Sequence, residues 1–285
     1  MTGTLYVCAT PIGNLEDVSQ RLLTTLRTVD LVAAEDTRHS LQLLRHFSII
    51  TELTSYHEHS KQARTDYLVA ALLAGKNIAL ISDAGMPGIS DPGEQFIAAC
   101  IEKEIRVVVV PGPMAGVAAL VISGLPTGRF AFEGFLPRSR KERREVLVSL
   151  LHEERTMVFY EAPHRLEETL TDMVQILGER KVALARELTK AFEEVKRGSL
   201  AVLLEMVKSS GVRGELVLVV EGASRDKDGP PAEKQDSETL LTMLLKQGLS
   251  PAQASRHAAK IGGSTRAELY ALAVRLSQQD PHHRV

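Results

Sequence analysis

Apolar and polar positions alternate along the first part of the chain in a way that predicts strands followed by amphipathic helices. Nearly continuous runs of Val, Ile, Leu and Ala, such as NIALIS (77–82) and RVVVVP (106–111), predict buried strands. Between such runs, apolar residues recur at helical spacing and predict helices over 17–28, 41–47, 63–73 and 94–103. Because the strands lack a polar face, we expect a sheet that helices cover on both sides, which is typical of an α/β domain.

The following segments repeat the alternation with a different kind of strand. FAFEGFLP (130–137), TMVFYE (156–161), KVALARE (181–187) and ELVLVVEG (215–222) predict strands, with helices over 139–151 and 166–177. These strands carry more polar and aromatic residues, which predicts a mixed sheet with antiparallel pairs.

The last part of the chain predicts a linker and a small helical domain. The polar stretch ASRDKDGPPAEKQD is typical of a linker. Three short helices follow, of which SPAQASRHAAKI and STRAELYALAVRL open on a Ser or Thr cap, in an order that resembles a helix-turn-helix. The sequence therefore predicts an α/β fold class: an α/β domain over 1–117, a second one over 118–223, a linker over 224–236 and a helical domain over 237–285.

The amino-acid composition indicates the class of protein and its expected location in the cell. The chain is 44% hydrophobic and 25% charged, as in soluble globular proteins. No long uncharged apolar segment occurs and no basic segment precedes the first strand, so we expect neither a membrane span nor a secretory signal, and a cytoplasmic location. Cys8 and Cys100 stand in apolar surroundings, which predicts buried free thiols.

Four loops that follow predicted strands stand out, and all but the second are rich in Gly or Pro: ATPIGN (9–14), AEDTR (34–38), SDAGMPGISDPG (82–93) and PGPMAG (111–116). Because these loops follow equivalent ends of neighbouring strands, we expect them to lie together along one edge of the sheet. We call this edge the rim, and it is the usual place for a ligand in an open α/β sheet. The chain has no GxxxxGK[ST] and no GxGxxG, which disfavours ATP and NAD, and His57 and His59 have no nearby cysteine, so no metal is predicted.

The loops themselves indicate the charge of the ligand. Glu35, Asp36, Asp83 and Asp91 fall in two of them, and basic residues are sparse there apart from Arg38 and His39. An acidic rim suits a cationic group better than a phosphate. Asp91, followed by Pro92 and Gly93, is expected to cap the next helix.

The ordered motifs TPIGNLED, AEDTR, SDAGMPGISDPG, PGPMAG with SGLP, EGFLPR, ARELTKAFEE and GELVLVVEG resemble the tetrapyrrole methylase superfamily, and in particular its ribosomal RNA branch. The resemblance covers about 1–222 and implies two α/β domains with S-adenosylmethionine in the cleft between them, and a homodimer. The ribosomal branch methylates the ribose 2′-oxygen of a cytidine in the decoding region of small-subunit (16S) ribosomal RNA, free or in the 30S subunit.

Carried over residue by residue, the resemblance implies cofactor contacts at Pro11, Ser82, Asp83, Met86, Met114, Ala115, Tyr160, Ala185, Gly214 and Glu215. Met86 stands where the family often has threonine, which removes a hydroxyl beside the cofactor. A carboxylate suits the cationic sulfonium, and Asp83 is the leading candidate.

A 2′-hydroxyl is a poor nucleophile, so a proton acceptor would help it. Glu187 and Glu161 are the candidate catalytic bases, with Glu133 third, although each could instead form a structural ion pair with an arginine, and positioning alone could suffice.

Positive charge for binding RNA is offered by Arg138, Arg140, Lys141, Arg143 and Arg144, and by Arg256, Lys260 and Arg266 near the end of the chain. A solvated helix face is the plainer interpretation of the first run. Two other functions stay open: methylation of a tetrapyrrole-type small molecule, and a non-catalytic RNA-binding factor in ribosome assembly.

Overall fold

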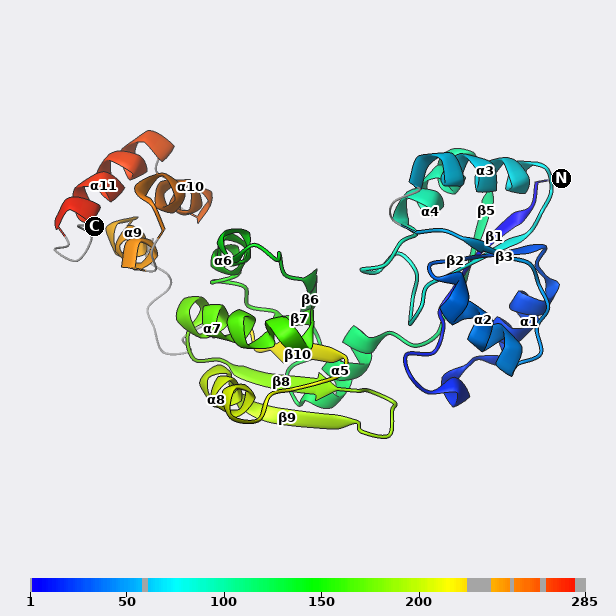
Figure 1. Ribbon diagram of the computed structural model, residues 1–285. Helices are drawn as coiled ribbons and strands as arrows, with labels where there is room; N and C mark the ends of the chain where they lie inside the picture. Colours follow the sequence, from blue (N-terminus) through cyan, green and yellow to red (C-terminus); the bar gives the residue numbers. More distant parts are fainter. Residues whose placement is uncertain (1, 58–60, 225–236, 247–248, 262–264, 280–285) are drawn as a thin grey trace.

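The computed structural model describes all residues except 1, 58–60, 225–236, 247–248, 262–264 and 280–285, and Figure 1 shows two α/β units followed by a group of helices. The first sheet has five parallel strands in the order β3 (Leu53–Ser55), β2 (Leu31–Ala34), β4 (Ile78–Ile81), β1 (Thr4–Cys8) and β5 (Arg106–Val110).

Helices cover both faces of this sheet, as its apolar strands predict. Leu31 and Ala33 pack in one core with α3 (Lys61–Leu73) and α4 (Glu94–Glu102). Val32 and Ala34, which point the other way, pack in a second core with α1 (Gln20–Thr28) and α2 (Thr37–His46). In Figure 1 the two pairs of helices lie on opposite sides of the sheet.

Helices α1 and α2 start three or more residues from their predicted positions, because capping side chains set their first turns. Ser19 accepts a hydrogen bond from the Leu22 N–H and starts α1, so that only a 3₁₀ turn, η1 (Leu15–Asp17), precedes it. Asp36 accepts from the Arg38 N–H and starts α2 four residues before the predicted helix.

Cys8 and Cys100 are free and buried, as predicted, and burial raises the pKa of both thiols to about 12.

The second sheet is mixed, as predicted. Its order is β6 (Phe130–Phe135), β7 (Thr156–Glu161), β10 (Leu216–Val220), β8 (Lys181–Arg186) and β9 (Glu194–Ser199). Only β6 and β7 are parallel neighbours; the other pairs are antiparallel. Helices α6 (Arg140–Ser149), α7 (Leu166–Leu177) and α8 (Leu200–Ser210) cover one face, and a 3₁₀ turn, η3 (Pro163–Arg165), leads into α7.

Helix α5 (Ala115–Ser123) covers the other face of the second sheet. Its Ala119 and Leu120 are buried against strand residues that include Val158, Val217 and Val219. The domain boundary expected after residue 117 therefore falls inside a helix that belongs to the second domain. The change of domain lies in the loop 111–114 that precedes α5.

The three predicted C-terminal helices are α9 (Ser237–Lys246), α10 (Pro251–Ile261) and α11 (Arg266–Gln279). Thr265 and Glu268 form a capping box at the start of α11, since each side chain accepts a hydrogen bond from the other residue's backbone N–H. Gln253 on α10 donates to Glu145 on α6 at 2.9 Å.

Within the described part of the chain, no helix is long and apolar enough to cross a membrane.

The basic residues of the segment 138–144, which follows β6, lie partly on the surface and partly in the interior. Arg143 is 1% exposed, and its guanidinium donates to Asp172 of α7 at 2.9 Å and to Glu168 at 3.3 Å. Arg144 donates to the other oxygen of Asp172. Arg143, which the sequence predicts as an RNA contact, is thus buried and pairs two helices, and it could reach a phosphate only by giving up its contacts with Asp172 and Glu168. Arg138, Arg140 and Lys141 are exposed.

Arg143→Ala is expected to lower the free energy of unfolding by about 3 kcal/mol, the lower end of the usual effect of breaking a buried ion pair, because Arg144 and Arg140 remain beside Asp172. Lys141→Ala, an exposed change on the same helix, should stay within about 0.5 kcal/mol of the wild type. Urea unfolding followed by circular dichroism measures both. Equal stabilities of the two variants would contradict the structural role of Arg143.

Candidate functional site

The four predicted loops form one rim. Because β1, β2, β4 and β5 run parallel and lie side by side, their carboxyl ends meet at one edge of the sheet. Backbone hydrogen bonds of 2.9 and 3.1 Å join Thr10 in the first loop to Gly85 in the third. Gly85 has a φ of +87°, which favours glycine. The shared rim that the sequence predicts is confirmed.

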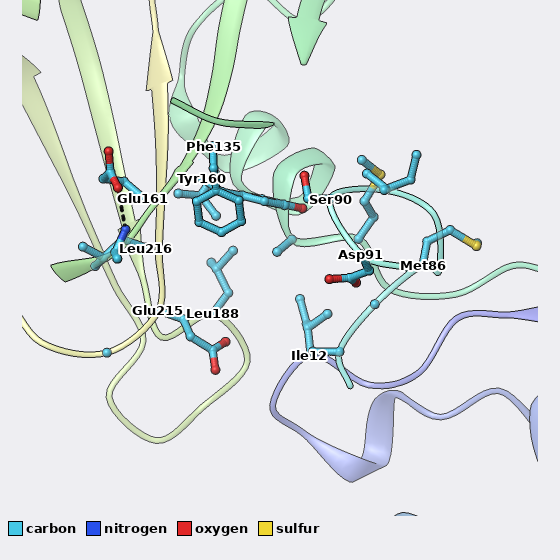
Figure 2. A pocket seen from close by; sticks show the side chains of 18 of the residues that line it. Ile12, Met86, Ser90, Asp91, Phe135, Tyr160, Glu161, Leu188, Glu215 and Leu216 are labelled. Atoms are coloured by element: carbon cyan, nitrogen blue, oxygen red, sulfur yellow. Dashed lines mark hydrogen bonds between the residues drawn. The ribbon is translucent and has the colours of Figure 1, made fainter. Parts of the chain in front are cut away.

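A cavity of about 410 Å³, called the first cavity here, opens where this rim meets the second sheet. Figure 2 shows Ile12, Met86 and Asp91 on the side of the first domain, opposite Tyr160 and Leu216 of the second. Most of its wall is apolar. Six of the residues predicted to contact a cofactor line it: Met86, Met114, Ala115, Tyr160, Gly214 and Glu215.

A second cavity of about 510 Å³ adjoins the first, and the two share Ile12, Ala84 and Glu215 in their walls. The remaining predicted contacts of the rim, Pro11, Ser82 and Asp83, line this second cavity. Ala185 lines neither cavity; it is buried in β8.

Tyr160 connects the floor of the first cavity to the start of α5. Its phenol oxygen accepts a hydrogen bond from the Gly116 N–H at 3.1 Å, and its ring contacts those of Phe132 and Phe135. Burial raises the pKa of the phenol. The side chain therefore stays protonated near neutral pH and fixes the helix end beside Met114 and Ala115.

Glu187 holds the Gly214–Glu215 turn in place. It accepts a hydrogen bond from the Glu215 N–H at 2.8 Å, and Lys190 bridges the Glu187 and Glu215 carboxylates at 3.1 and 2.9 Å. A Cβ on Gly214, whose φ is +92°, would lie 2.5 Å from the Glu187 carboxylate. The Glu215 N–H, followed by Lys190, lowers the pKa of Glu187. Glu187 lines neither cavity, and a lowered pKa makes it a weak proton acceptor near neutral pH.

Glu161 lines the first cavity, but its two oxygens are already bound. One accepts from the Thr169 hydroxyl at 2.6 Å, and the other accepts from the Ala162 N–H at 2.8 Å and lies 3.5 Å from Arg165. The carboxylate is 1% exposed. This is the structural ion pair that the sequence left open. Glu133, the third candidate, lies on β6 and lines neither cavity.

Four carboxylates gather at the rim. The Asp36 N–H donates to Asp83 at 3.1 Å, and the Asp83 N–H donates to Glu35 at 3.4 Å. Burial raises the pKa of Glu35 to about 7, and the charge of Asp91 adds to this. Burial likewise raises the pKa of Asp91 to about 6, with a further contribution from the charge of Asp83. A cation entering the rim would relieve this repulsion.

Asp91 does not cap α4, contrary to the expectation from its sequence context. Gly93 occupies the cap position with a φ of +147°, and no side chain caps the helix. A Cβ on Gly93 would lie 3.1 Å from Leu80 and from the Gly88 backbone, so the turn requires glycine. This turn leaves Asp91 in the wall of the first cavity. The proline and glycine of SDPG thus shape a turn that carries Asp91 into the cavity wall, where the sequence predicts a helix cap.

The predicted RNA contacts are scattered. Arg138, Arg140 and Lys141 lie exposed at the start of α6, and Arg256 and Arg266 lie exposed on α10 and α11. The Lys260 side chain, like His59, lies outside the described residues.

Among the residues that are described, no three His, Cys, Asp or Glu side chains gather closely enough to hold a metal ion.

The rim, the apolar cavity between two α/β domains and the motifs that build them define a methylase fold. The family model of the Tetrapyrrole (Corrin/Porphyrin) Methylases matches residues 4–204, and the chain belongs to this family. A solved uroporphyrin-III C-methyltransferase from Thermus thermophilus in complex with S-adenosyl homocysteine has the same fold. It is 17% identical, with a TM-score of 0.51, and the match covers 77% of this chain and 97% of that one. A diphthine synthase structure gives a TM-score of 0.58 at 12% identity, over 94% of this chain and 99% of that one.

Curated relatives are much more similar in sequence. The ribosomal RNA small subunit methyltransferase I of Synechocystis sp. is 49% identical over 275 residues, 96% of this chain and 98% of the relative. The protein of the same name from Escherichia coli O157:H7 is 46% identical over 276 residues, 95% of each chain. The match thus extends past the family model into the C-terminal helices.

Proposed function

We propose that the protein is an S-adenosylmethionine-dependent methyltransferase of small-subunit ribosomal RNA. The observation that carries the proposal is the identity of 46–49% to ribosomal RNA small subunit methyltransferase I over almost the full length of both chains. The C-terminal helices, which the family model does not cover, are included in these matches.

The finer proposal is transfer of the methyl group to the ribose 2′-oxygen of a cytidine in the decoding region. It is supported by the motifs of the rim, such as AEDTR and SDAGMPGISDPG, which resemble the ribosomal RNA branch of the family. Methylation of a tetrapyrrole-type small molecule is the alternative within enzymes, and the extra helices and the exposed Arg138, Arg140, Lys141 and Arg256 favour RNA over it. A non-catalytic assembly factor would have no need for an intact cofactor cavity.

The first cavity fits the proposed cofactor. Its volume of about 410 Å³ is in the range of small-molecule sites. Asp91, rather than the expected Asp83, would face a cationic sulfonium, because Asp91 lines the first cavity and Asp83 lines the second. The positive end of the α5 dipole beside Met114 and Ala115 suits a carboxylate. Phe135 and Tyr160 offer ring faces for a nucleobase. When bound, the cofactor supplies an electrophilic methyl group.

The protein then contributes by aligning the 2′-hydroxyl of the RNA with the methyl group of the cofactor. Tyr160 fixes the end of α5, and Glu187 with Lys190 fixes the Gly214–Glu215 turn, so that opposite walls of the cavity are rigid. Glu161 and Glu187 are both held in structural contacts. We therefore assign the rate enhancement to orientation of the 2′-hydroxyl rather than to either carboxylate as a base.

Cofactor affinity is expected to depend on pH through Asp91. With its pKa at about 6, Asp91 is charged above neutral pH and attracts the sulfonium, and below about pH 6 affinity should fall by up to tenfold per unit. Asp91→Asn should weaken binding at pH 8 and flatten this dependence. Calorimetric titration from pH 5 to 8 measures both, with Glu94→Gln as the control on the same segment. A variant that keeps the wild-type pH dependence would contradict the role of Asp91.

In cells that lack the protein, 2′-O-methylation in the decoding region of small-subunit RNA should disappear, and a plasmid copy should restore it. Mapping of 2′-O-methyl groups along the RNA measures this. A copy with Gly214→Ala should fail to restore it, because the added Cβ displaces Glu187. An unchanged methylation pattern in the deletion would remove the ribosomal proposal.

We also propose that the protein forms a homodimer. Val121 and Val117, four residues apart on α5, are 68% and 39% exposed, and Val109 on the edge strand β5 is 54% exposed. An open strand edge and an exposed apolar helix face are each typical of a surface that another chain covers.

Val121→Asp is expected to shift the protein from dimer to monomer, because a carboxylate would be buried at the interface. Light scattering during gel filtration measures the mass. Val202→Asp serves as the control, since Val202 on α8 is equally exposed, at 65%, and should not alter the mass. A wild-type protein that is monomeric at micromolar concentration would contradict the proposal.

A further inference from the structure

The second cavity has a wall of its own on α2. His39, Gln42, Leu43 and His46 line it, and their spacing of three, four and seven residues places them on one face of the helix. The opposite walls come from the first and third loops and from Lys190 and Glu215 of the second domain. The cavity therefore lies between the two domains, beside the first cavity.

The position of this helix face is fixed by the rim. Asp36 caps α2 through the Arg38 N–H at 2.8 Å, and its own N–H donates to Asp83 at 3.1 Å. The third loop thus ties the start of α2 to the boundary of the first cavity. The helix presents two imidazole rings and one amide to the second cavity.

Ser40 adds an independent sign that a ligand binds there. It lines the second cavity and is 2% exposed, yet its hydroxyl oxygen has no hydrogen-bond partner. A buried hydroxyl without a partner is unfavourable and uncommon in folded proteins. A ligand with a donor or acceptor at this point would satisfy it.

The charges of the wall define the chemistry of the ligand. Asp83 and Glu215 are carboxylates, and Lys190, the lining ammonium group, already pairs with Glu187 and Glu215. A substrate with several carboxylates would meet repulsion here. A heterocyclic base with its ribose is uncharged, and imidazole rings are among the side chains on which unpaired RNA bases stack.

We propose that the second cavity is the subsite for the target nucleotide, which is turned out of its RNA strand with its base against the His39–His46 face of α2. The ribose would then point to the boundary at Ile12, Ala84 and Glu215, where the two cavities meet. This assignment rests on the proposed function and adds to it where the substrate nucleotide is held.

The test compares His39→Ala, His46→Ala and Ser40→Ala with the wild type in methyl transfer to 30S subunits from cells that lack the protein. Removal of a stacking ring is expected to lower kcat/KM about 5- to 100-fold, mainly through KM. The Kd for S-adenosylmethionine should stay within about twofold, because the α2 face does not line the first cavity. Leu41→Ala, on the opposite face of α2, serves as the matched control and should change neither constant.

Ser40→Ala separates a binding role from a structural one. Removal of an unpaired hydroxyl from a helix should leave Tm equal or higher, while kcat/KM falls about 2- to 10-fold. Weaker cofactor binding in the histidine variants, or an unchanged kcat/KM in all three, would overturn the subsite. Failure of the proposed function itself is distinguishable, since the wild type would then transfer no methyl group to the subunits.

Discussion

The parallel pairing of β1 with both β4 and β5 is the constraint on which the rest of the structure depends. It places three strand ends side by side, and β2 extends the row. The loops that follow can then exchange backbone hydrogen bonds, as Thr10 and Gly85 do, and carry polar groups to one edge. A first domain with these strands antiparallel would distribute the same loops over two edges.

The carboxylates of the site have different tasks, and their neighbours decide which. Glu161 and Glu187 are surrounded by N–H, hydroxyl and cationic groups, which hold both carboxylates in place. Glu35 and Asp91 are partly buried near other carboxylates, which raises their pKa values. The first pair gives rigidity, and the second pair gives the rim its attraction for a cation.

Much of the fold could be predicted, because most strands of the two sheets are apolar runs and helices of the first domain such as α1 and α2 are amphipathic. Helix α5 was missed because AGVAALVIS is apolar on every side, which leaves no periodicity to recognise. Strand β9 was missed because EVKRGS is polar, and it is a strand only through its pairing with β8. Within the site, the loops were predictable from glycine and proline, but the buried state of Arg143 and the hydrogen bonds of Glu187 depend on residues distant in sequence.

The order of strands in the second sheet has a consequence for how the chain acquires its structure during synthesis. The first sheet is complete once β5 ends at Val110, so this domain can fold while the rest is still being made. In the second sheet β10 is central, between β7 and β8, although it is the last of the described strands along the chain. Until Val220 has left the ribosome, β7 and β8 each lack a neighbour, and the apolar face of α5 has no finished sheet to cover. Folding of the second domain is therefore a late, largely single event that follows the emergence of its middle strand.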